Sequence, residues 1–195
     1  MLKLLNYKRA LLSYVRGFFV TLLSSQVRAK GLRIERNVRL TGTFKFGRNV
    51  FLSDNVIMYR NIIIDDDSYI GDNVEFRCHS SVAIKIGKKC TVNKNSILIG
   101  KVDIGDDVMI APDCNIIGAS HNFSESKKLI REQGIERKGV VIEDNVWLGA
   151  KVIVLDRVSI GTGSVIGAGS VVTKSIPSYS IAVGNPCKVV KRRDK

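Results

Sequence analysis

An aliphatic or aromatic residue recurs at every sixth position along most of the chain. The first series consists of Ile34, Leu40, Phe46, Leu52, Met58, Ile64, Ile70, Phe76 and Val82. After a shift of four residues it continues as Ile86, Val92, Leu98, Ile104, Ile110 and Ile116, and after a long gap it returns as Ile142, Leu148, Val154, Ile160, Ile166 and Val172. This period matches neither the alternation of an ordinary strand nor the 3.6-residue period of a helix.

The six-residue period predicts an all-β solenoid in which each unit supplies one short strand and one corner. Three units complete a triangular turn, and the next turn stacks about 4.8 Å above it through parallel strand pairing. We expect roughly six or seven turns, with the residue at each sixth position pointing inward. Cys90 and Cys114 stand four places after such a residue, where small buried side chains belong. Glycine often follows the inward residue and is expected to supply the backbone angles of the corners, as at Gly47, Gly71, Gly87, Gly105, Gly149, Gly161 and Gly167.

Residues 2–27 carry a different pattern, with apolar residues at helical spacing. It predicts one amphipathic helix, with any kink at Gly17; the stripe contains Leu4, Leu11, Leu12, Val15, Phe18, Phe19, Leu22 and Leu23. The apolar stretch 10–23 is shorter than the ~20 residues of a membrane span and contains Arg16, and no small-residue cleavage site precedes Lys30. We therefore expect neither a transmembrane helix nor a secretory signal. The helix is expected to dock on its own domain or a sister subunit in preference to an anionic membrane.

The formal net charge of +13 is concentrated at the two ends of the chain. Residues 1–48 contain eleven bases and one acid, residues 188–195 contain five bases and one acid, and the segment between them is nearly neutral. No basic stretch is interleaved with stacking aromatic residues, so a nucleic-acid partner is not expected. The four cysteines form no CxxC pair or His cluster, which indicates a reduced, cytoplasmic setting and no metal site.

Several motifs occur in a fixed order in the second half of the chain. They are Ile104-Gly-Asp-Asp-Val-Met-Ile-Ala-Pro-Asp, Ala119-Ser-His-Asn-Phe, Val141-Ile-Glu-Asp-Asn-Val-Trp-Leu-Gly-Ala, Ile166-Gly-Ala-Gly-Ser-Val-Val-Thr-Lys and Val183-Gly-Asn-Pro-Cys-Lys-Val-Val. With the hexads, they make residues 34–195 resemble the hexapeptide-repeat acyltransferases, in particular galactoside and maltose O-acetyltransferases and the sugar O-acetyltransferases of bacterial surface-polysaccharide clusters. The resemblance implies a left-handed parallel β-helix and a homotrimer with active sites between the prisms. We expect a helical segment 1–33, a β-helix 34–187 with a protruding loop 118–139, and a basic tail 188–195.

The resemblance also assigns roles to single residues. His121, at the start of the long loop, matches the family's catalytic histidine and is expected to be a general base, whereas His79 has no counterpart and is expected to have no role in the reaction. Asn93 resembles the residue that meets the acceptor hydroxyl or the acetyl group, with Asn95 as the alternative. Trp147 matches an aromatic residue near the active site, where it would contact pantetheine or a sugar, or serve only in packing.

The same resemblance implies acetyl-CoA as the acyl donor. The backbone N–H of Ala150 would face the thioester oxygen, and Ala168, Thr173 and Lys174 would lie along pantetheine and adenine. Lys188 and Lys191 would lie near the phosphates, in agreement with the positive charge of the tail.

We therefore predict an O-acetyltransferase that moves acetyl directly to a sugar hydroxyl, without a covalent enzyme intermediate or a metal, in surface-polysaccharide biosynthesis. The acceptor would be a sugar, a nucleotide sugar or a lipid-linked saccharide, with peripheral contact of residues 1–27 with the inner face of the membrane as an open alternative. A serine or antibiotic acetyltransferase, an amino-sugar N-acetyltransferase and a non-catalytic scaffold remain the other hypotheses. A zinc carbonic anhydrase of this fold needs three histidines, and the chain has two.

Overall fold

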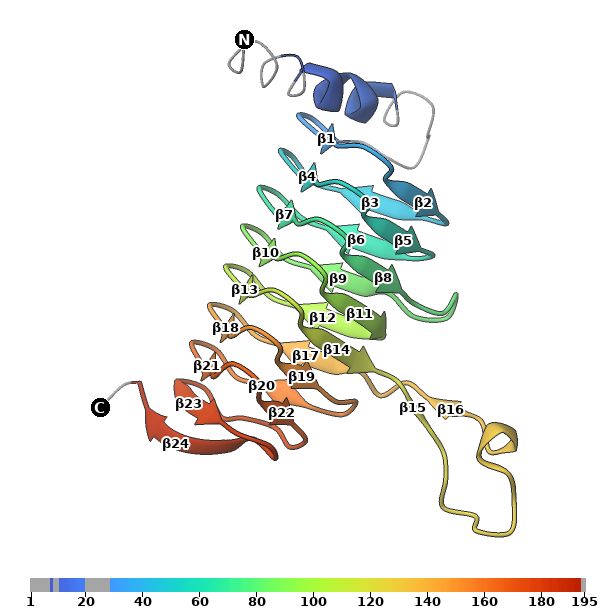
Figure 1. The fold of residues 1–195 in the computed structure, drawn as a ribbon, viewed down its shortest axis with the longest axis vertical. Helices are drawn as coiled ribbons and strands as arrows, with labels where there is room; N and C mark the ends of the chain where they lie inside the picture. Colours follow the sequence, from blue (N-terminus) through green and yellow to red (C-terminus); the bar gives the residue numbers. More distant parts are fainter. Residues whose placement is uncertain (1–7, 9–10, 20–28, 194–195) are drawn as a thin grey trace.

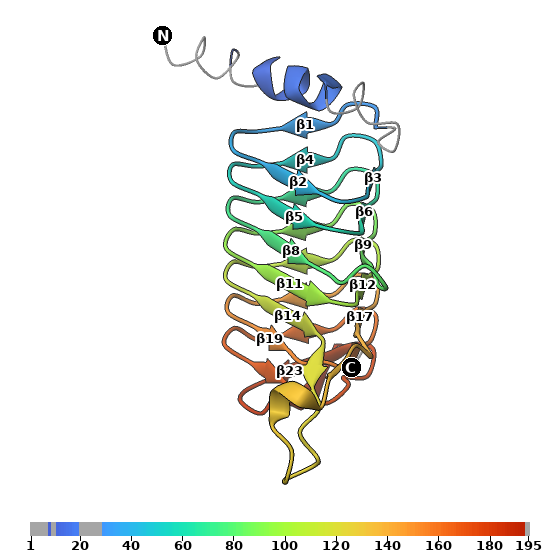
Figure 2. The same cartoon turned by 90° about the vertical axis from the view of Figure 1, so that its right-hand side faces the viewer.

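The chain winds into a three-sided prism of short strands (Figure 1). The computed structural model describes residues 8, 11–19 and 29–193. Predictions for the ends of the N-terminal helix and for the last two residues of the basic tail lie outside the described residues. Each turn passes through three sheets in the same order, which we call faces A, B and C, and Figure 2 shows the turns stacked one above another.

Nearly all strands pair in parallel with the strand one turn away. Face A contains β1 (Arg33–Ile34), β4 (Phe51–Leu52), β7 (Tyr69–Ile70), β10 (Thr91–Val92), β13 (Met109–Ile110), β18 (Trp147–Leu148), β21 (Val165–Ile166), β23 (Ser180–Val183) and β24 (Lys188–Arg192). Face B contains β2 (Arg39–Thr41), β5 (Ile57–Tyr59), β8 (Glu75–Arg77), β11 (Ile97–Gly100), β14 (Asn115–Gly118), β19 (Ile153–Val154) and β22 (Val171–Val172). Face C contains β3 (Phe44–Phe46), β6 (Ile62–Ile64), β9 (Ile84–Ile86), β12 (Val102–Ile104), β17 (Val140–Ile142) and β20 (Ser159–Ile160).

The predicted solenoid is confirmed, and it is about one turn longer than expected. β23 lies beyond Val172, the last residue of the six-residue series, and adds a further parallel level to face A. β24 then closes this end of the sheet as an antiparallel strand against β23.

The residues at every sixth position form the core, with two exceptions. Leu40 is only half-buried, and Val82 lies in the loop between β8 and β9 instead of pointing inward from a strand. Ile84 and Ile86 fill the core there, because four extra residues displace the register. Burying one such aliphatic side chain stabilises the fold by roughly 2 kcal/mol. Cys90 is buried as predicted, and its burial raises the pKa of its thiol to about 11.

The expected reason for the corner glycines is wrong. Gly105 does not have a positive φ; a Cβ atom there would lie 2.2 Å from Asp144 Oδ1 and 2.9 Å from its backbone nitrogen. Glycine is needed because the next turn passes so close. The left-handed corner angles are taken mainly by polar residues, with Asn and Asp among the non-glycine residues that tolerate them best: Asn37, Asn49, Asn55, Asp67, Asn73, Lys89, Asn95, Asp107, Asp113, Asn145 and Lys151.

Polar side chains also link successive turns along the corner between faces A and B. Asn37 donates to Asn55, Asn55 to Asn73, Asn73 to Asn95 and Asn95 to Asp113, at N···O distances of 3.1, 3.1, 3.0 and 3.0 Å. This asparagine ladder satisfies amide groups that the repeated corner exposes.

Residues 11–19 form a helix across the first turn of the prism, without a break at Gly17 (Figure 1). The helix packs through its small residues: Ser13 is buried, and a Cβ atom at Gly17 would lie 2.0 Å from the carbonyl oxygen of Leu32. Arg16 Nη1 donates to the carbonyl oxygen of Ile34 at 3.2 Å. The stripe members that the structure describes, between residues 11 and 19, therefore do not dock on the prism, contrary to one of the expected contacts.

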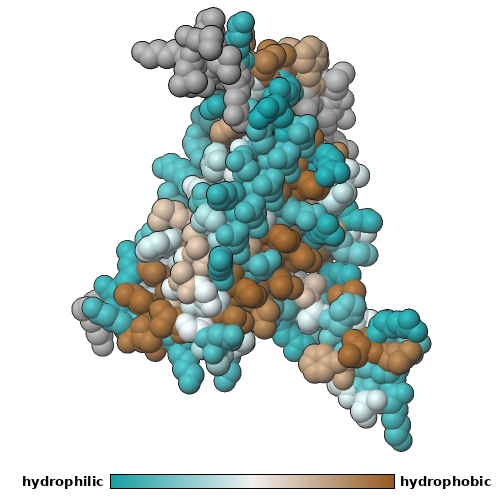
Figure 3. Space-filling view, in the orientation of Figure 1, coloured by the Kyte–Doolittle hydropathy of each residue, from teal (hydrophilic) through white to brown (hydrophobic). Residues whose placement is uncertain are grey.

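That stripe is exposed, and Figure 3 shows apolar surface at this end of the prism. Its exposed members among the described residues are Leu11, Leu12, Val15, Phe18 and Phe19, and Tyr14 beside them is exposed as well. No helix among the described residues is long and apolar enough to cross a membrane.

Candidate active site

One long excursion leaves the prism between β14 and β17 (Figure 2). Its base is an antiparallel pair, β15 (Ser120–His121) with β16 (Ile135–Glu136), and a 3-10 helix (Ile130–Glu132) lies farther out. Asp156 of the next turn ties the base to the prism: it accepts hydrogen bonds from Ser120 Oγ at 3.3 Å and from the Gly139 N–H at 2.7 Å. These contacts hold His121 beside the corner between faces B and C.

His121 is exposed between two hollows, one on each side of β15. The first, of about 320 Å³, is lined by Arg77, Cys78, His79, Ile99, Gly100, Ala119, Ser120, His121, Ile135 and Arg137. The second, of about 430 Å³, contains Phe123, Leu155, Asp156 and Arg157 among its lining residues. Small molecules commonly bind in such concave, partly apolar sites.

The first hollow brings His79 to the same site as His121, although His79 was expected to have no role there. His79 follows β8 and His121 follows β14, and both strands belong to face B. The N–H of Ser81 lies 3.3 Å from His79 Nδ1, which makes Nε2 the nitrogen that carries the proton in the neutral ring. In the sequence, the position of His79 near this site is indicated only by the four-residue shift of the six-residue series near Val82. This shift marks a smaller excursion at the same corner.

Cys78 also lines this hollow, but its surroundings make it a poor nucleophile. Its Sγ lies 3.4 Å from the carbonyl oxygen of Asn61 and 3.5 Å from that of Tyr59. Burial raises the pKa of the Cys78 thiol, so it stays protonated near neutral pH.

Asn93 lies at another corner, between faces A and B. It follows β10, and its Nδ2 donates to the carbonyl oxygen of Ile110 at 3.0 Å. Asn95 has a φ of 60° and belongs to the asparagine ladder, so its side chain is used in the corner itself. Neither asparagine lines the hollows beside His121.

Trp147, Ala150 and Ala168 lie on the Asn93 side of the prism. Trp147 is 48% exposed on face A, in register with Met109 and Val165 of the adjoining turns. Ala150 and Ala168 follow β18 and β21 at the corner between faces A and B. Within the described part of the chain, their backbone N–H groups donate no hydrogen bond, so they can serve a bound ligand.

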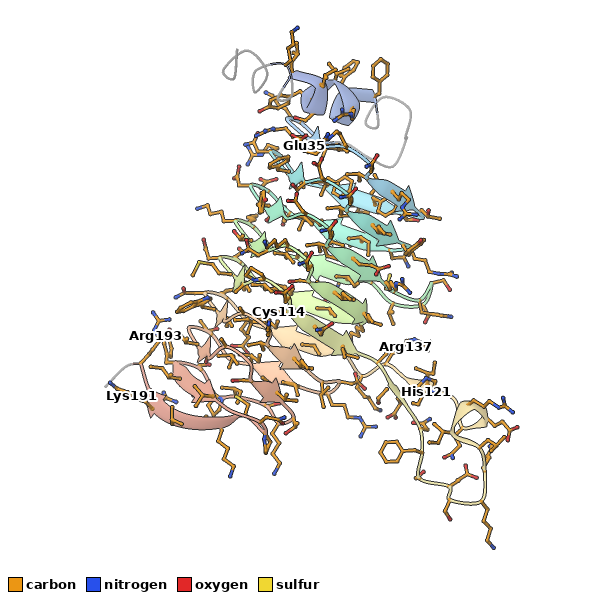
Figure 4. The ribbon with its side chains drawn as sticks, viewed as in Figure 1. Glu35, Cys114, His121, Arg137, Lys191 and Arg193 are labelled. Atoms are coloured by element: carbon orange, nitrogen blue, oxygen red, sulfur yellow. The ribbon has the colours of Figure 1, made fainter. Side chains whose placement is uncertain are left out.

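The four remaining predicted residues are exposed but divided between two places. Thr173 and Lys174 follow β22 at the corner between faces B and C, the corner from which His121 projects. Lys188 and Lys191 lie in β24, at the end of face A (Figure 4).

The candidate residues therefore form two groups on different corners of one protomer. We call His79, His121, Thr173 and Lys174 the histidine corner, and Asn93, Trp147, Ala150 and Ala168 the tryptophan corner. The described residues contain no group of three or more His, Cys, Asp or Glu side chains that could hold a metal ion.

Comparison with known proteins gives consistent matches. The profile of the family "Bacterial transferase hexapeptide (six repeats)" matches residues 139–174. A protein of Staphylococcus aureus (strain COL) that is named as an acetyltransferase is 40% identical over 93% of this chain and 87% of its own length. Against two other curated relatives, the chain spans 42% and 60% of their lengths.

Solved structures agree with these matches. A maltose O-acetyltransferase from Clostridium difficile 630 is 38% identical, with a TM-score of 0.57 over 64% of this chain and 66% of that chain. A galactoside acetyltransferase in complex with coenzyme A is 32% identical, with a TM-score of 0.58 over 67% of this chain and 64% of that chain.

Proposed function

Because this chain belongs to the family of hexapeptide-repeat acetyltransferases, we propose that it transfers an acetyl group from acetyl-CoA to a sugar hydroxyl. The observation that carries the proposal is His121, an exposed histidine fixed at the base of the one long excursion and bordered by two hollows. The similarity to maltose and galactoside acetyltransferases supports a sugar as the acceptor.

In the proposed reaction, His121 takes the proton from the acceptor hydroxyl as its oxygen attacks the thioester carbonyl. The free N–H of Ala150 donates to the oxygen of that carbonyl, where negative charge develops. The carbon–sulfur bond then breaks, the acetyl group stays on the acceptor oxygen, and the coenzyme leaves as a thiol after receiving from His121 the proton that the acceptor hydroxyl lost. The protonated, buried Cys78 thiol supports direct transfer without an acyl-enzyme.

We infer a homotrimer, because one protomer separates the groups that this reaction needs. His121 stands at the histidine corner, whereas Ala150 and Ala168 stand at the tryptophan corner. A second copy that places its tryptophan corner against the histidine corner of the first would unite them. Three copies related by a rotation axis close this arrangement and form three equivalent sites.

The donor is proposed to lie along the cleft between two such prisms. Trp147 offers an apolar surface to pantetheine or to a sugar, and Asn93 is proposed to meet the acceptor hydroxyl or the acetyl group. Thr173 and Lys174 would line the pantetheine and adenine, while Lys188 and Lys191 would meet the phosphates. The exposure of both lysines in β24 supports contact with a phosphate as point charges.

For the biological setting, we propose the assembly of surface polysaccharide at the inner face of a membrane. The exposed apolar stripe of the helix, beside eleven basic residues in positions 1–48, supports contact with anionic lipid. A lipid-linked saccharide would present its hydroxyl groups at such a surface.

The test is release of coenzyme A thiol from acetyl-CoA in the presence of a panel of sugars, nucleotide sugars and lipid-linked saccharides. We expect acetylation of at least one hydroxyl, and a loss of roughly 10² to 10⁴ in the rate for His121→Ala, which removes the general base. Binding of coenzyme A to the variant, measured by calorimetry, is the control and should persist. A variant that turns over at the normal rate would contradict the role of His121.

A further inference from the structure

The hollow beside His121 carries positive charge that acetyl transfer to a neutral sugar does not require. Two arginines and two histidines line it, Arg77, Arg137, His79 and His121, and no carboxylate among the described residues does. The remaining lining is small or apolar, including Ile99, Ala119 and Ile135. An arginine that already forms an ion pair with an acidic residue has fewer N–H groups left for a ligand. The acidic partners of Arg77 and Arg137 therefore decide whether each can bind an anion.

Arg137 has no acidic partner within the described residues. It directly follows β16, whose Ile135 pairs with His121, so the hairpin fixes its distance from the histidine (Figure 4). The adjacent carboxylate, Glu136, is already used by Arg157 and by Lys138, the latter at 3.4 Å. Arg137 is also half-buried, which reduces the screening of its charge by water.

Arg77 is only partly neutralised. Its Nε donates to Glu75 Oε1 on the same strand, and this contact raises the pKa of Arg77. Its two Nη atoms donate no hydrogen bond to any described residue. A guanidinium has five N–H groups in a planar fork, so Arg77 can hold Glu75 and still donate to a second anion.

We propose, on the basis of the function inferred above, that the acceptor sugar is anionic and that Arg137 and Arg77 bind its carboxylate or phosphate group. Guanidinium groups bind both of these anions through paired hydrogen bonds. The small and apolar residues Ile99, Ala119 and Ile135 would contact the face of the sugar ring. The negative group would then fix the ring so that one hydroxyl faces His121, with His79 Nε2 as a further donor.

The experiment measures acceptor binding by calorimetry in the absence of acetyl-CoA, so its result does not depend on turnover. Three sugars with the same ring serve as probes: a neutral methyl hexoside, the corresponding uronide and the corresponding glycosyl phosphate. For the wild-type chain we expect at least one anionic probe to bind about 10-fold or more tightly than the neutral one. The uronide and phosphate arms identify which anion the site takes.

Four variants, one of them Arg77→Gln, locate the charge that is responsible. Arg137→Gln should abolish the preference, so that charged and neutral probes bind equally within about twofold, while Arg137→Lys should retain part of it because the charge remains without the planar fork. Arg131→Gln is the matched control, because Arg131 lies in the 3-10 helix outside the hollow, and it should leave the preference unchanged.

Equal binding of all three probes to the wild-type chain would overturn the inference. The inference would also be overturned if the preference for an anionic probe persisted in Arg137→Gln and also in Arg77→Gln, each tested as a single variant. Neither result would bear on acetyl transfer, which the thiol-release assay tests separately.

Discussion

At the corners of the prism, distances of two to three ångströms decide which side chain is allowed. A Cβ atom added to Gly105 would meet Asp144 of the next turn, and the Asp144 carboxylate there accepts a hydrogen bond from the Asp106 N–H at 2.8 Å. The glycine therefore permits an aspartate of one turn to bind the backbone of the turn before it. The same arrangement recurs at Gly47 with Asp66 and at Gly87 with Asp106.

We expect Gly105→Ala to lower the free energy of unfolding by about 1–3 kcal/mol, the usual cost of forcing extra atoms into a packed site. Chemical denaturation followed by circular dichroism measures it. Gly169→Ala is the comparison: no atom of the described residues lies within 4 Å of its added Cβ, and only its φ of +70° opposes the change. A cost of about 1 kcal/mol is expected there. A smaller cost at Gly105 than at Gly169 would contradict the close-approach explanation.

At the scale of the strand and turn, the sequence alone predicts most of the fold. The six-residue spacing of buried residues is visible in the order of the amino acids. Ile104, Ile110 and Ile116 are therefore assigned to the core correctly without any knowledge of their spatial neighbours. Val82 is assigned wrongly, because an insertion at a corner keeps an apolar residue in the series while the strand moves to Ile84–Ile86.

The site is less predictable, because it depends on which corners lie together. His121 stands out in the sequence as one of two histidines and opens the long excursion. That His79 lies near His121 becomes clear only when β8 and β14 are known to belong to the same face. That Arg137 lies near His121 becomes clear only when β15 is known to pair with β16. For the same reason, the separation of Asn93 from His121 could not be inferred from their spacing.

The exposed apolar stripe of the N-terminal helix can be tested by substitution. Phe18 and Phe19 are 62% and 51% exposed, so replacing both by Glu should leave the prism intact while removing apolar contact and adding negative charge. We expect wild-type chain, but not Phe18→Glu/Phe19→Glu, to sediment with vesicles containing phosphatidylglycerol at low salt. Lys85→Glu on face C provides a control that reverses one charge elsewhere.

Salt provides a second control for the same experiment. Attraction between the basic helix and anionic lipid should weaken as the Debye length falls from about 10 Å at 0.1 M to about 3 Å at 1 M. Wild-type chain that ignores anionic vesicles at low salt would contradict membrane contact and leave the stripe to a sister subunit.

For the whole molecule, the separation of the two corners gives a test of the proposed trimer. His121→Ala disables the histidine corner, and Ala168→Trp is expected to block the tryptophan corner by filling the space beside its free N–H group. Each variant alone should be inactive. When the two are mixed by unfolding and refolding together, about a quarter of the sites in random trimers should combine two intact corners and regain activity.

The readout is acetyl transfer by the mixture against each variant refolded alone. Recovered activity with a trimeric mass in light scattering is the expected result. A mixture that stays inactive although both variants form trimers would show that each protomer holds a complete site.

The stacking of turns sets the distance along the prism axis between His121 and the N-terminal helix. Four inter-turn steps separate β2 from β14 on face B, so the base of the excursion that carries His121 lies about 20 Å along the prism axis from the first turn. Because every turn adds the same increment, insertion or removal of a whole turn would change this reach in units of about 5 Å without altering either corner. If the helix contacts a membrane as proposed, the number of turns between the helix and His121 sets the distance from that membrane at which a lipid-linked acceptor is modified. A chain of this family with more turns would then act farther from the membrane surface.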